Sequence, residues 1–253
     1  MFSPEDRERL LADLVARARA EDSVTGAAVV GSGARGQTDR WSDIDLALCL
    51  SPSVTPQQAA EAWSGYLGSV REVAHTLDLW SGTTLYRVNL LADSLQVDLS
   101  FWPAETFASN GEPFALLFGQ AGASAAPAPP DPENAVGWGW LYALHTRSAL
   151  ARGRPWQAVQ MLNGLRDQVV ALACLRYGLP WALGRGVDGL PRGTRTALTG
   201  TLPASPEPAS LIPAFAAAVE LLRAEAAQLD PALATRLAAP LSALTESICQ
   251  AAG

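Results

Sequence analysis

The sequence contains no lysine at all, and the 18 basic residues among its 253 residues are all arginine. The absence of lysine excludes a Walker A phosphate loop, which needs a lysine on the phosphates, and every reaction that forms a Schiff base on lysine. Any phosphate clamp must therefore use arginine, whose planar guanidinium suits phosphate oxygens. A GC-rich genome that favours arginine and alanine codons accounts for the bias itself, but the excluded chemistries stay excluded.

Histidine and cysteine are also scarce. Only His75 and His145 occur, so a zinc site with several histidine ligands is not expected. The three cysteines, Cys49, Cys174 and Cys249, are far apart and lie in apolar runs. Buried, reduced thiols are typical of a cytoplasmic protein, which is the location that we expect.

Long hydrophobic runs and an excess of positive charge are missing as well. No uninterrupted apolar run reaches about 18 residues, and the first residues, MFSPEDRERL, contain no apolar signal region, so no membrane partner is expected. The formal net charge is −7, whereas proteins that grip nucleic acids usually carry a basic stripe. We therefore expect a small-molecule partner and no nucleic acid.

The residues that are present predict an α+β fold in the first half of the chain. Hydrophobic residues make up 49% of the sequence, which is enough for a real core. Hydrophobic periodicity predicts, in chain order, a helix over residues 3–20, strands over 24–31 and 44–50, a helix from 55 to about 73, and strands over 75–80, 84–91 and 94–102. Short links between the last three strands indicate antiparallel connections, so we expect a mixed β-sheet with flanking helices.

The second half is expected to be an α-helical bundle domain. The stretch AGASAAPAPPDPENA, residues 121–135, reads as a semi-rigid linker. Beyond it the strand signal disappears, and helices are expected over 133–152, 155–177, 207–228 and 230–251. These signals divide the chain into a catalytic domain at 1–120 and a helical domain at 136–253. Four tryptophans are expected to anchor the packing between helices: Trp138, Trp140, Trp156 and Trp181.

Two carboxylates open the second predicted strand. Asp43 and Asp45 are separated by Ile44, and residues i and i+2 of a strand point to the same face. Two like charges held so close together are costly unless a cation lies between them. Oxygen ligands in a small cluster suit Mg²⁺, which keeps waters and phosphate oxygens as its other ligands.

A third carboxylate and a glycine loop complete the pattern. Asp98 alternates with apolar residues in SLQVDLSFW, so its side chain is expected on the polar face of its strand. Gly31-Ser32 stands at the end of the first strand, ten residues separate Ser32 from Asp43, and a glycine backbone permits close approach of a phosphate. Three carboxylates that hold two Mg²⁺ ions are suited to transferring a nucleotide from a nucleoside triphosphate.

These residues carry a resemblance to a known family. An apolar strand, Gly-Ser, ten further residues and an Asp-x-Asp pair resemble the signature of the DNA polymerase beta-type nucleotidyltransferase superfamily, over residues 24–101. The helical half around residues 140–178 is similar to the C-terminal bundles of aminoglycoside and lincosamide nucleotidyltransferases. The resemblance implies ATP as the usual donor and Asp43, Asp45 and Asp98 as catalytic metal ligands. It also implies a small hydroxyl-bearing acceptor, with an aminoglycoside- or lincosamide-like antibiotic as one candidate, and a second subunit nearby in a homodimer.

The missing lysine is the main departure from this family. Relatives often hold phosphates with a lysine, and the available substitutes here are Arg35, Arg40, Arg147 and Arg166. Arg35 follows Ser32 in the loop, and Arg166 lies in an otherwise apolar helical stretch, where a charge needs a partner such as the triphosphate or a neighbouring acid. We expect Gly31, Ser32, Arg35, Ser42 and Arg166 to bind the nucleotide. Ser42 has an alternative role as a turn former.

Two other functions use the same fold. An antitoxin-type nucleotidyltransferase would bind or modify a protein partner, but such modules are minimal proteins of about 100 residues, and this chain has a long helical half. His145 has no arginine four to six residues before it, so a fused ribonuclease toxin is not expected. A non-catalytic relative would bind nucleotide without chemistry, which the presence of all three acids disfavours.

Overall fold

A computed structural model of the chain describes residues 1–124 and 128–251, with side chains up to Ile248. These residues divide into two compact units, Met1–Ala128 and Pro129–Gly253. Residues 125–127 of the expected linker and residues 252–253 of the expected helical domain lie outside the described residues. The first helix of the second unit begins at Pro132, so the end of the expected linker is already helical.

The first unit contains the mixed sheet that the sequence predicts. Its elements are α1 (Pro4–Ala20), β1 (Val24–Val30), α2 (Gly31–Ala34), β2 (Ile44–Leu50), α3 (Pro56–Val70), β3 (Val73–Ser81), β4 (Thr84–Leu91), β5 (Gln96–Pro103) and β6 (Phe114–Phe118). The strand order within the described part of this unit is β3-β4-β5-β2-β1-β6. β2 and β5 run parallel, and the other neighbours run antiparallel.

Two elements of this unit were not predicted from the sequence. The turn α2 follows β1 directly and lies inside the expected loop. The short strand β6 pairs with β1 at the edge of the sheet. Its five residues, FALLF, show no alternation that would distinguish a strand, so only the tertiary pairing with β1 identifies it.

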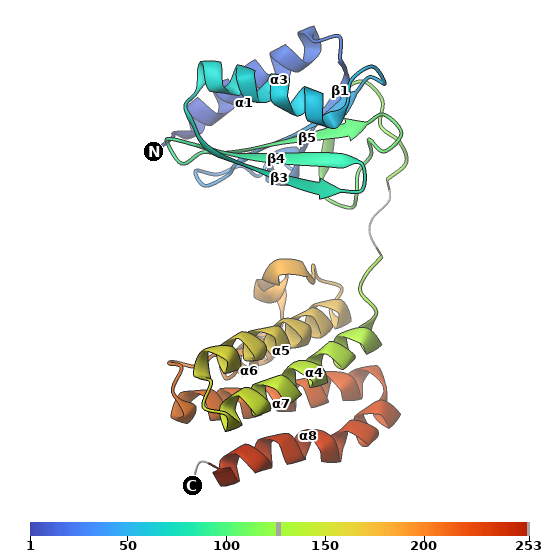
Figure 1. The fold of residues 1–253 in the computed structure, drawn as a ribbon. Coiled ribbons are helices and arrows are strands. Elements are labelled where there is room, and N and C mark those ends of the chain that lie inside the picture. Colours follow the sequence, from blue (N-terminus) through green and yellow to red (C-terminus); the bar gives the residue numbers. More distant parts are fainter. Residues whose placement is uncertain (125–127, 252–253) are drawn as a thin grey trace. The chain divides into compact units, whose positions relative to one another are not determined.

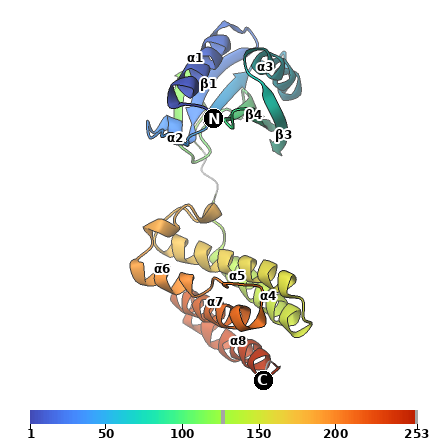
Figure 2. The same cartoon turned by 90° about the vertical axis from the view of Figure 1, so that its left-hand side faces the viewer.

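The helices α1 and α3 cover one face of the sheet, as Figures 1 and 2 show. Both helices begin with a capping box. The Ser3 hydroxyl accepts a hydrogen bond from the Asp6 N–H at 3.1 Å, and the Thr55 hydroxyl accepts one from the Gln58 N–H at 3.2 Å. A proline follows each cap, where its missing N–H costs nothing. The core between helices and sheet includes Leu14 and Trp63, which are fully buried.

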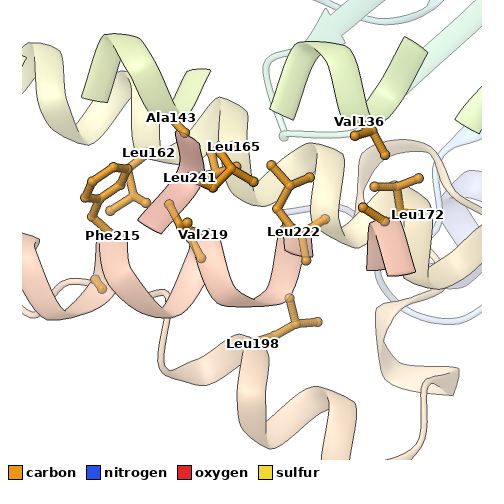
Figure 3. Close-up of a cluster of buried hydrophobic side chains, with 14 of the residues drawn as sticks. Val136, Ala143, Leu162, Leu165, Leu172, Leu198, Phe215, Val219, Leu222 and Leu241 are labelled. Atoms are coloured by element: carbon orange, nitrogen blue, oxygen red, sulfur yellow. The ribbon is translucent and has the colours of Figure 1, made fainter. Parts of the chain in front are cut away.

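The second unit is an α-helical bundle. Its main helices are α4 (Pro132–Ala151), α5 (Pro155–Arg176), α6 (Arg192–Thr199), α7 (Pro208–Leu229) and α8 (Pro231–Ala251). Four of them lie close to their predicted bounds, whereas α6 was not predicted. Figure 3 shows part of the core, in which mainly leucine, valine and alanine side chains from α4, α5, α6, α7 and α8 lie together, with Phe215 beside Leu162 at one end.

The expectation that tryptophans anchor this bundle is wrong. Trp138, Trp140, Trp156 and Trp181 are 48%, 39%, 74% and 37% exposed, respectively. Aliphatic side chains fill the core closely, and Gly139 shows how closely: a Cβ at this position would lie 2.6 Å from Leu222 Cδ1. The indoles are left at the surface of the bundle.

Two further expectations can be compared with the described residues. Cys49 and Cys174 are buried and free, as expected, whereas the side chain of Cys249 lies outside the described part. None of the described helices combines the length and hydropathy that crossing a membrane requires.

Candidate active site

Three carboxylates meet on the sheet face opposite to α1 and α3. Asp45 of β2 pairs directly with Asp98 of β5 in the parallel register, and directly paired residues project from the same face. Asp43 lies two residues before Asp45, immediately ahead of β2. One oxygen from each of Asp43, Asp45 and Asp98 lies within 4.8 Å of the other two. The structure therefore brings together all three acids that the sequence singled out.

The apolar alternation of the two strands explains this placement. Ile44 and Leu46 on either side of Asp45, and Val97 and Leu99 on either side of Asp98, are at most 2% exposed and pack under the helices. Because side chains alternate along a strand, burying these residues forces the acids to the other face. There, each carboxylate is half-buried.

Burial and mutual repulsion make the cluster difficult to ionise. Burial, followed by the charges of Asp43 and Asp98, raises the pKa of Asp45 to about 7. Burial also raises the pKa of Asp98 to about 6, against a hydrogen bond from Gln96 that lowers it. Such a cluster favours either bound protons or a bound cation, and an all-oxygen donor set fits Mg²⁺.

Gln96 is a site residue that the sequence reasoning missed. Its amide nitrogen donates to both oxygens of Asp98, at 3.1 and 3.0 Å, and lies 3.5 Å from Asp43 Oδ2. The signal was present in the sequence, because Gln96 precedes Asp98 by two residues and so shares its face of β5. Gln96 orients the Asp98 carboxylate toward Asp43.

Gly31 packs directly against the acidic cluster. Its φ is +64°, a left-handed conformation that favours glycine, and a Cβ at this position would lie 2.7 Å from Asp45 Oδ2. Its N–H donates to the Pro113 carbonyl at 3.1 Å. The following N–H groups, in the first turn of α2, have no intrahelical partner. A phosphate beside Asp45 would therefore meet the backbone of Ser32 and Gly33 rather than the N–H of Gly31.

The loop between α2 and the acids is held by a turn and by a buried arginine. The Ser42 hydroxyl accepts from the Asp39 N–H at 2.9 Å and donates to Asp39 Oδ1 at 3.1 Å. Arg7 of α1 is only 4% exposed, and its guanidinium donates to the carbonyls of Asp39 and Ser42. Ser42 thus has the turn-forming role in this structure, and Arg7 is a second residue that the sequence reasoning missed.

The expected phosphate-binding arginines lie in different units. Arg35 is exposed at the C-terminal end of α2, and Arg40 is exposed in the same loop, with its guanidinium 4.3 Å from the Trp41 ring centroid. Arg166 belongs to α5 of the second unit. It donates at 2.9 Å to each of three oxygens, which belong to Asn163 and Thr201. Its guanidinium is therefore hydrogen bonded by neutral groups within the bundle.

Comparison with known proteins agrees with this geometry. Residues 11–101 match a family model described as a nucleotidyltransferase domain, and the matched segment contains Gly31 and the three acids. No curated protein matches the chain. Among solved structures, the chain is similar to an aminoglycoside 6-adenyltransferase from Bacillus subtilis, with 14% identity, a TM-score of 0.41, and coverage of 98% of this chain and 99% of that chain.

That structural similarity is too distant to identify an acceptor. The comparison with known families therefore depends on the match of residues 11–101. The matched segment contains strands β1 to β4, most of β5, the Gly-Ser turn and the acidic cluster. The match therefore shows a nucleotidyltransferase domain over residues 11–101 of the chain, and the acidic cluster lies within it.

Proposed function

We propose that the protein transfers a nucleoside monophosphate from a nucleoside triphosphate, with ATP as the expected donor, to a hydroxyl of a small molecule. The observation that carries the proposal is the convergence of Asp43, Asp45 and Asp98, whose oxygens lie within 4.8 Å of one another. No other chemistry explains the cost of holding three carboxylates together as simply as a divalent cation does.

Each carboxylate has its own role in this proposal. Asp43 and Asp45 hold the cation at the triphosphate, and Asp98 lies at the acceptor side, where it binds the second cation or takes the proton of the acceptor hydroxyl. When bound, Mg²⁺ supplies positive charge that neutralises the triphosphate and the departing pyrophosphate. Gln96 keeps Asp98 turned toward Asp43 before the substrates arrive.

The donor is held by groups near the turn after β1. We assign phosphate contacts to the backbone N–H groups of Ser32 and Gly33, to the Ser32 hydroxyl and to Arg35. Gly31 takes part by having no side chain, which allows a phosphate to approach Asp45 closely. Nucleotide contacts by Ser42 and Arg166 stay predictions. In the structure each of these side chains is hydrogen bonded to neighbours within its own unit.

The acceptor is a small hydroxyl compound. An aminoglycoside- or lincosamide-like antibiotic is the class that the sequence resemblance suggests, and the net charge of −7 would attract a cationic member by electrostatic steering. A cytoplasmic location belongs to the same proposal, because Cys49 and Cys174 are unpaired. A homodimer stays an untested expectation.

Release of pyrophosphate tests the proposal directly. The purified protein is incubated with Mg²⁺, each of the four common nucleoside triphosphates and a panel of hydroxylated small molecules. We expect acceptor-dependent release that chelation of the metal abolishes. Replacing Asp45 by Asn should lower turnover by at least about a thousandfold, because the variant loses a charged ligand beside the phosphates.

Asp13→Asn provides the matched control. Asp13 is exposed on α1, so the same change in charge should leave turnover within about twofold of the unchanged protein. Full activity in Asp45→Asn, or release that persists without a divalent metal, would refute the proposed function.

A further inference from the structure

We infer that the sheet face beside Asp98 binds an apolar part of the acceptor, so that the acceptor is a hydroxyl compound with an uncharged hydrophobic side. This inference rests on the proposed function and adds the substrate class. The registers of β3, β4 and β5 place a set of apolar side chains next to the catalytic acids.

Three rows of paired residues cross the sheet from the acids to its β3 edge. The first row runs Asp45, Asp98, Val88, Leu77, and the second runs Ala47, Ser100, Tyr86, Leu79. The third runs Gln96, Leu90, His75. Directly paired residues share a face, and neighbouring strands are about 5 Å apart. The backbone of Val88 is therefore one strand, or about 5 Å, from that of Asp98, and the backbone of Leu77 is two strands, or about 10 Å, away.

The apolar and aromatic β3 and β4 residues of these rows form what we call the apolar shelf: Leu77, Leu79, Tyr86, Val88 and Leu90. His75 borders it at the end of the third row. Its leucines are unusually open for a sheet, with Leu77 51%, Leu79 50% and Leu90 47% exposed. Tyr86 and Val88 are half-buried. An exposed apolar patch at a catalytic centre is a common sign of a ligand surface.

The shelf has no charged group of its own. The ionic residues of β3 and β4, Asp78 and Arg87, lie on the opposite face, where two 2.6 Å hydrogen bonds pair them. A polycation would therefore find no carboxylate among the shelf residues to pair with. An apolar ring or chain can instead cover the leucines and keep its hydroxyl at Asp98.

Tyr86 is the aromatic residue of the shelf, and it adds one polar group to the apolar surface. The Tyr86 ring meets Trp102 edge-on, with centroids 5.8 Å apart, and the Trp102 indole is held by a 2.8 Å hydrogen bond to Ser100 Oγ. The Tyr86 hydroxyl has no hydrogen-bond partner among the described residues. An apolar surface with one free hydroxyl matches an acceptor that is hydrophobic with a few polar groups.

Pairing of two copies along β3 would not cover the shelf. β3 is an edge strand, and its free backbone groups lie in the plane of the sheet, whereas the shelf side chains stand perpendicular to it. In Figure 1 the helices α1 and α3 lie on the other face of the sheet from the shelf. The direct row from Asp98 to Leu77 favours a substrate as the occupant.

A series of neutral acceptors tests the inference. Methyl, butyl and hexyl β-D-glucosides present the same hydroxyls with a growing apolar tail, and their binding to the full chain with Mg²⁺ is measured by titration calorimetry. We expect hexyl glucoside to bind roughly tenfold or more tightly than methyl glucoside, since each buried methylene strengthens binding severalfold. With Mg-ATP present, the KM for the glucoside should fall in the same order, while the KM for ATP stays constant.

Two variants separate the shelf from general hydrophobicity. The double variant Leu77→Ser, Leu79→Ser should lose most of the preference for the hexyl tail. Trp80→Ser removes a side chain of comparable exposure, 55%, from the same strand but from the opposite face, and it should keep the preference. Thermal melts must show that both variants are folded to a similar extent.

The outcomes distinguish this inference from the proposed function. Tail-dependent binding that the double variant loses, without any pyrophosphate release, would support the shelf and refute the proposed reaction. Release with polycationic acceptors, but no dependence of glucoside binding on tail length, would support the reaction and refute the shelf. Equal loss of preference in Trp80→Ser, or a double variant that changes only the oligomeric state in sedimentation, would also refute it.

Discussion

At the scale of single residues, Gly31 is held in place by two independent constraints. It has a positive φ, and the space that a side chain would occupy is filled by the Asp45 carboxylate. Gly31→Ala must therefore either strain the backbone or push Asp45 away from Asp43 and Asp98. We expect a loss of about 1–3 kcal/mol in the free energy of unfolding and a much larger fall in turnover.

Gly36→Ala is the control for this prediction. Gly36 has the same φ of +64°, but a Cβ there meets nothing within 4 Å. Chemical denaturation and pyrophosphate release measure the two effects. If the two alanine variants lost activity equally, backbone strain alone would be responsible and the contact with Asp45 would not matter.

The raised pKa of Asp45 predicts how the stability of the metal-free protein depends on pH. The pKa is about 7 in the folded state against 3.8 for the free group, so between these values the folded state binds more protons than the unfolded state. The free energy of unfolding should therefore fall as pH rises from about 4 to 7, and the full penalty should persist above pH 7. Melting in the presence of a chelator should show this decrease.

Asp45→Asn should flatten that profile. Asparagine carries no proton to lose, so the variant should gain stability relative to the unchanged protein at pH 8, by a few degrees in melting temperature, and gain less at pH 5. Added Mg²⁺ should raise the melting temperature of the unchanged protein more than that of the variant. Parallel pH profiles for the two proteins would contradict the assignment of the raised pKa to Asp45.

At the scale of elements, the loop before β2 depends on α1. Arg7 is buried, and its guanidinium donates to the Asp39 and Ser42 carbonyls that precede the acids. Arg7→Met keeps most of the apolar stem but leaves these carbonyls without their donor. We expect the free energy of unfolding to fall by about 1–3 kcal/mol. Turnover should also fall, because the loop no longer holds Asp43 in place beside Asp45 and Asp98.

Arg9→Met is the comparison for this element. Arg9 lies on the exposed side of α1 and pairs only with the nearby Asp6 of the same helix, so its replacement should cost well under 1 kcal/mol. Denaturant unfolding compares the two variants. Equal effects would mean that the loop is positioned by β2 alone.

Element boundaries followed from the sequence wherever the signal was local. The strands β2 and β4 have the predicted lengths or nearly so, and α1 and α3 begin where Ser-Pro and Thr-Pro indicate. The strand β6 was missed because its pairing with β1 is non-local. The helix α6 was missed because its eight residues carry a single buried side chain, Leu198, and so no apolar stripe.

At the scale of the whole molecule, the two units have separate cores. Leu222 is fully buried in the bundle against Gly139, and Figure 3 places it among side chains from several helices. Leu222→Ala should destabilise the second unit by about 2–5 kcal/mol, because the cavity cannot collapse onto a rigid helix backbone. Calorimetric melting measures this loss.

The same variant should leave the acidic cluster intact. Asp43, Asp45 and Asp98 all belong to the first unit, so the affinity for Mg²⁺, measured by calorimetry below the melting temperature, should be unchanged. An affinity that fell in step with the stability of the bundle would show that the acidic cluster depends on the second unit.

The sequence by itself determined which residues form the acidic cluster and on which face of the sheet they lie. Strand alternation is a local rule, so Asp45 and Asp98 could be assigned to polar faces from their apolar neighbours alone, and the Gly-Ser turn marked the end of the preceding strand. Only the tertiary structure decided which groups surround these acids. The contacts of Gly31, Gln96 and Arg7, and the apolar rows that lead from Asp98 to Leu77, depend on strand order and register, which pairing between distant segments fixes and no local pattern encodes.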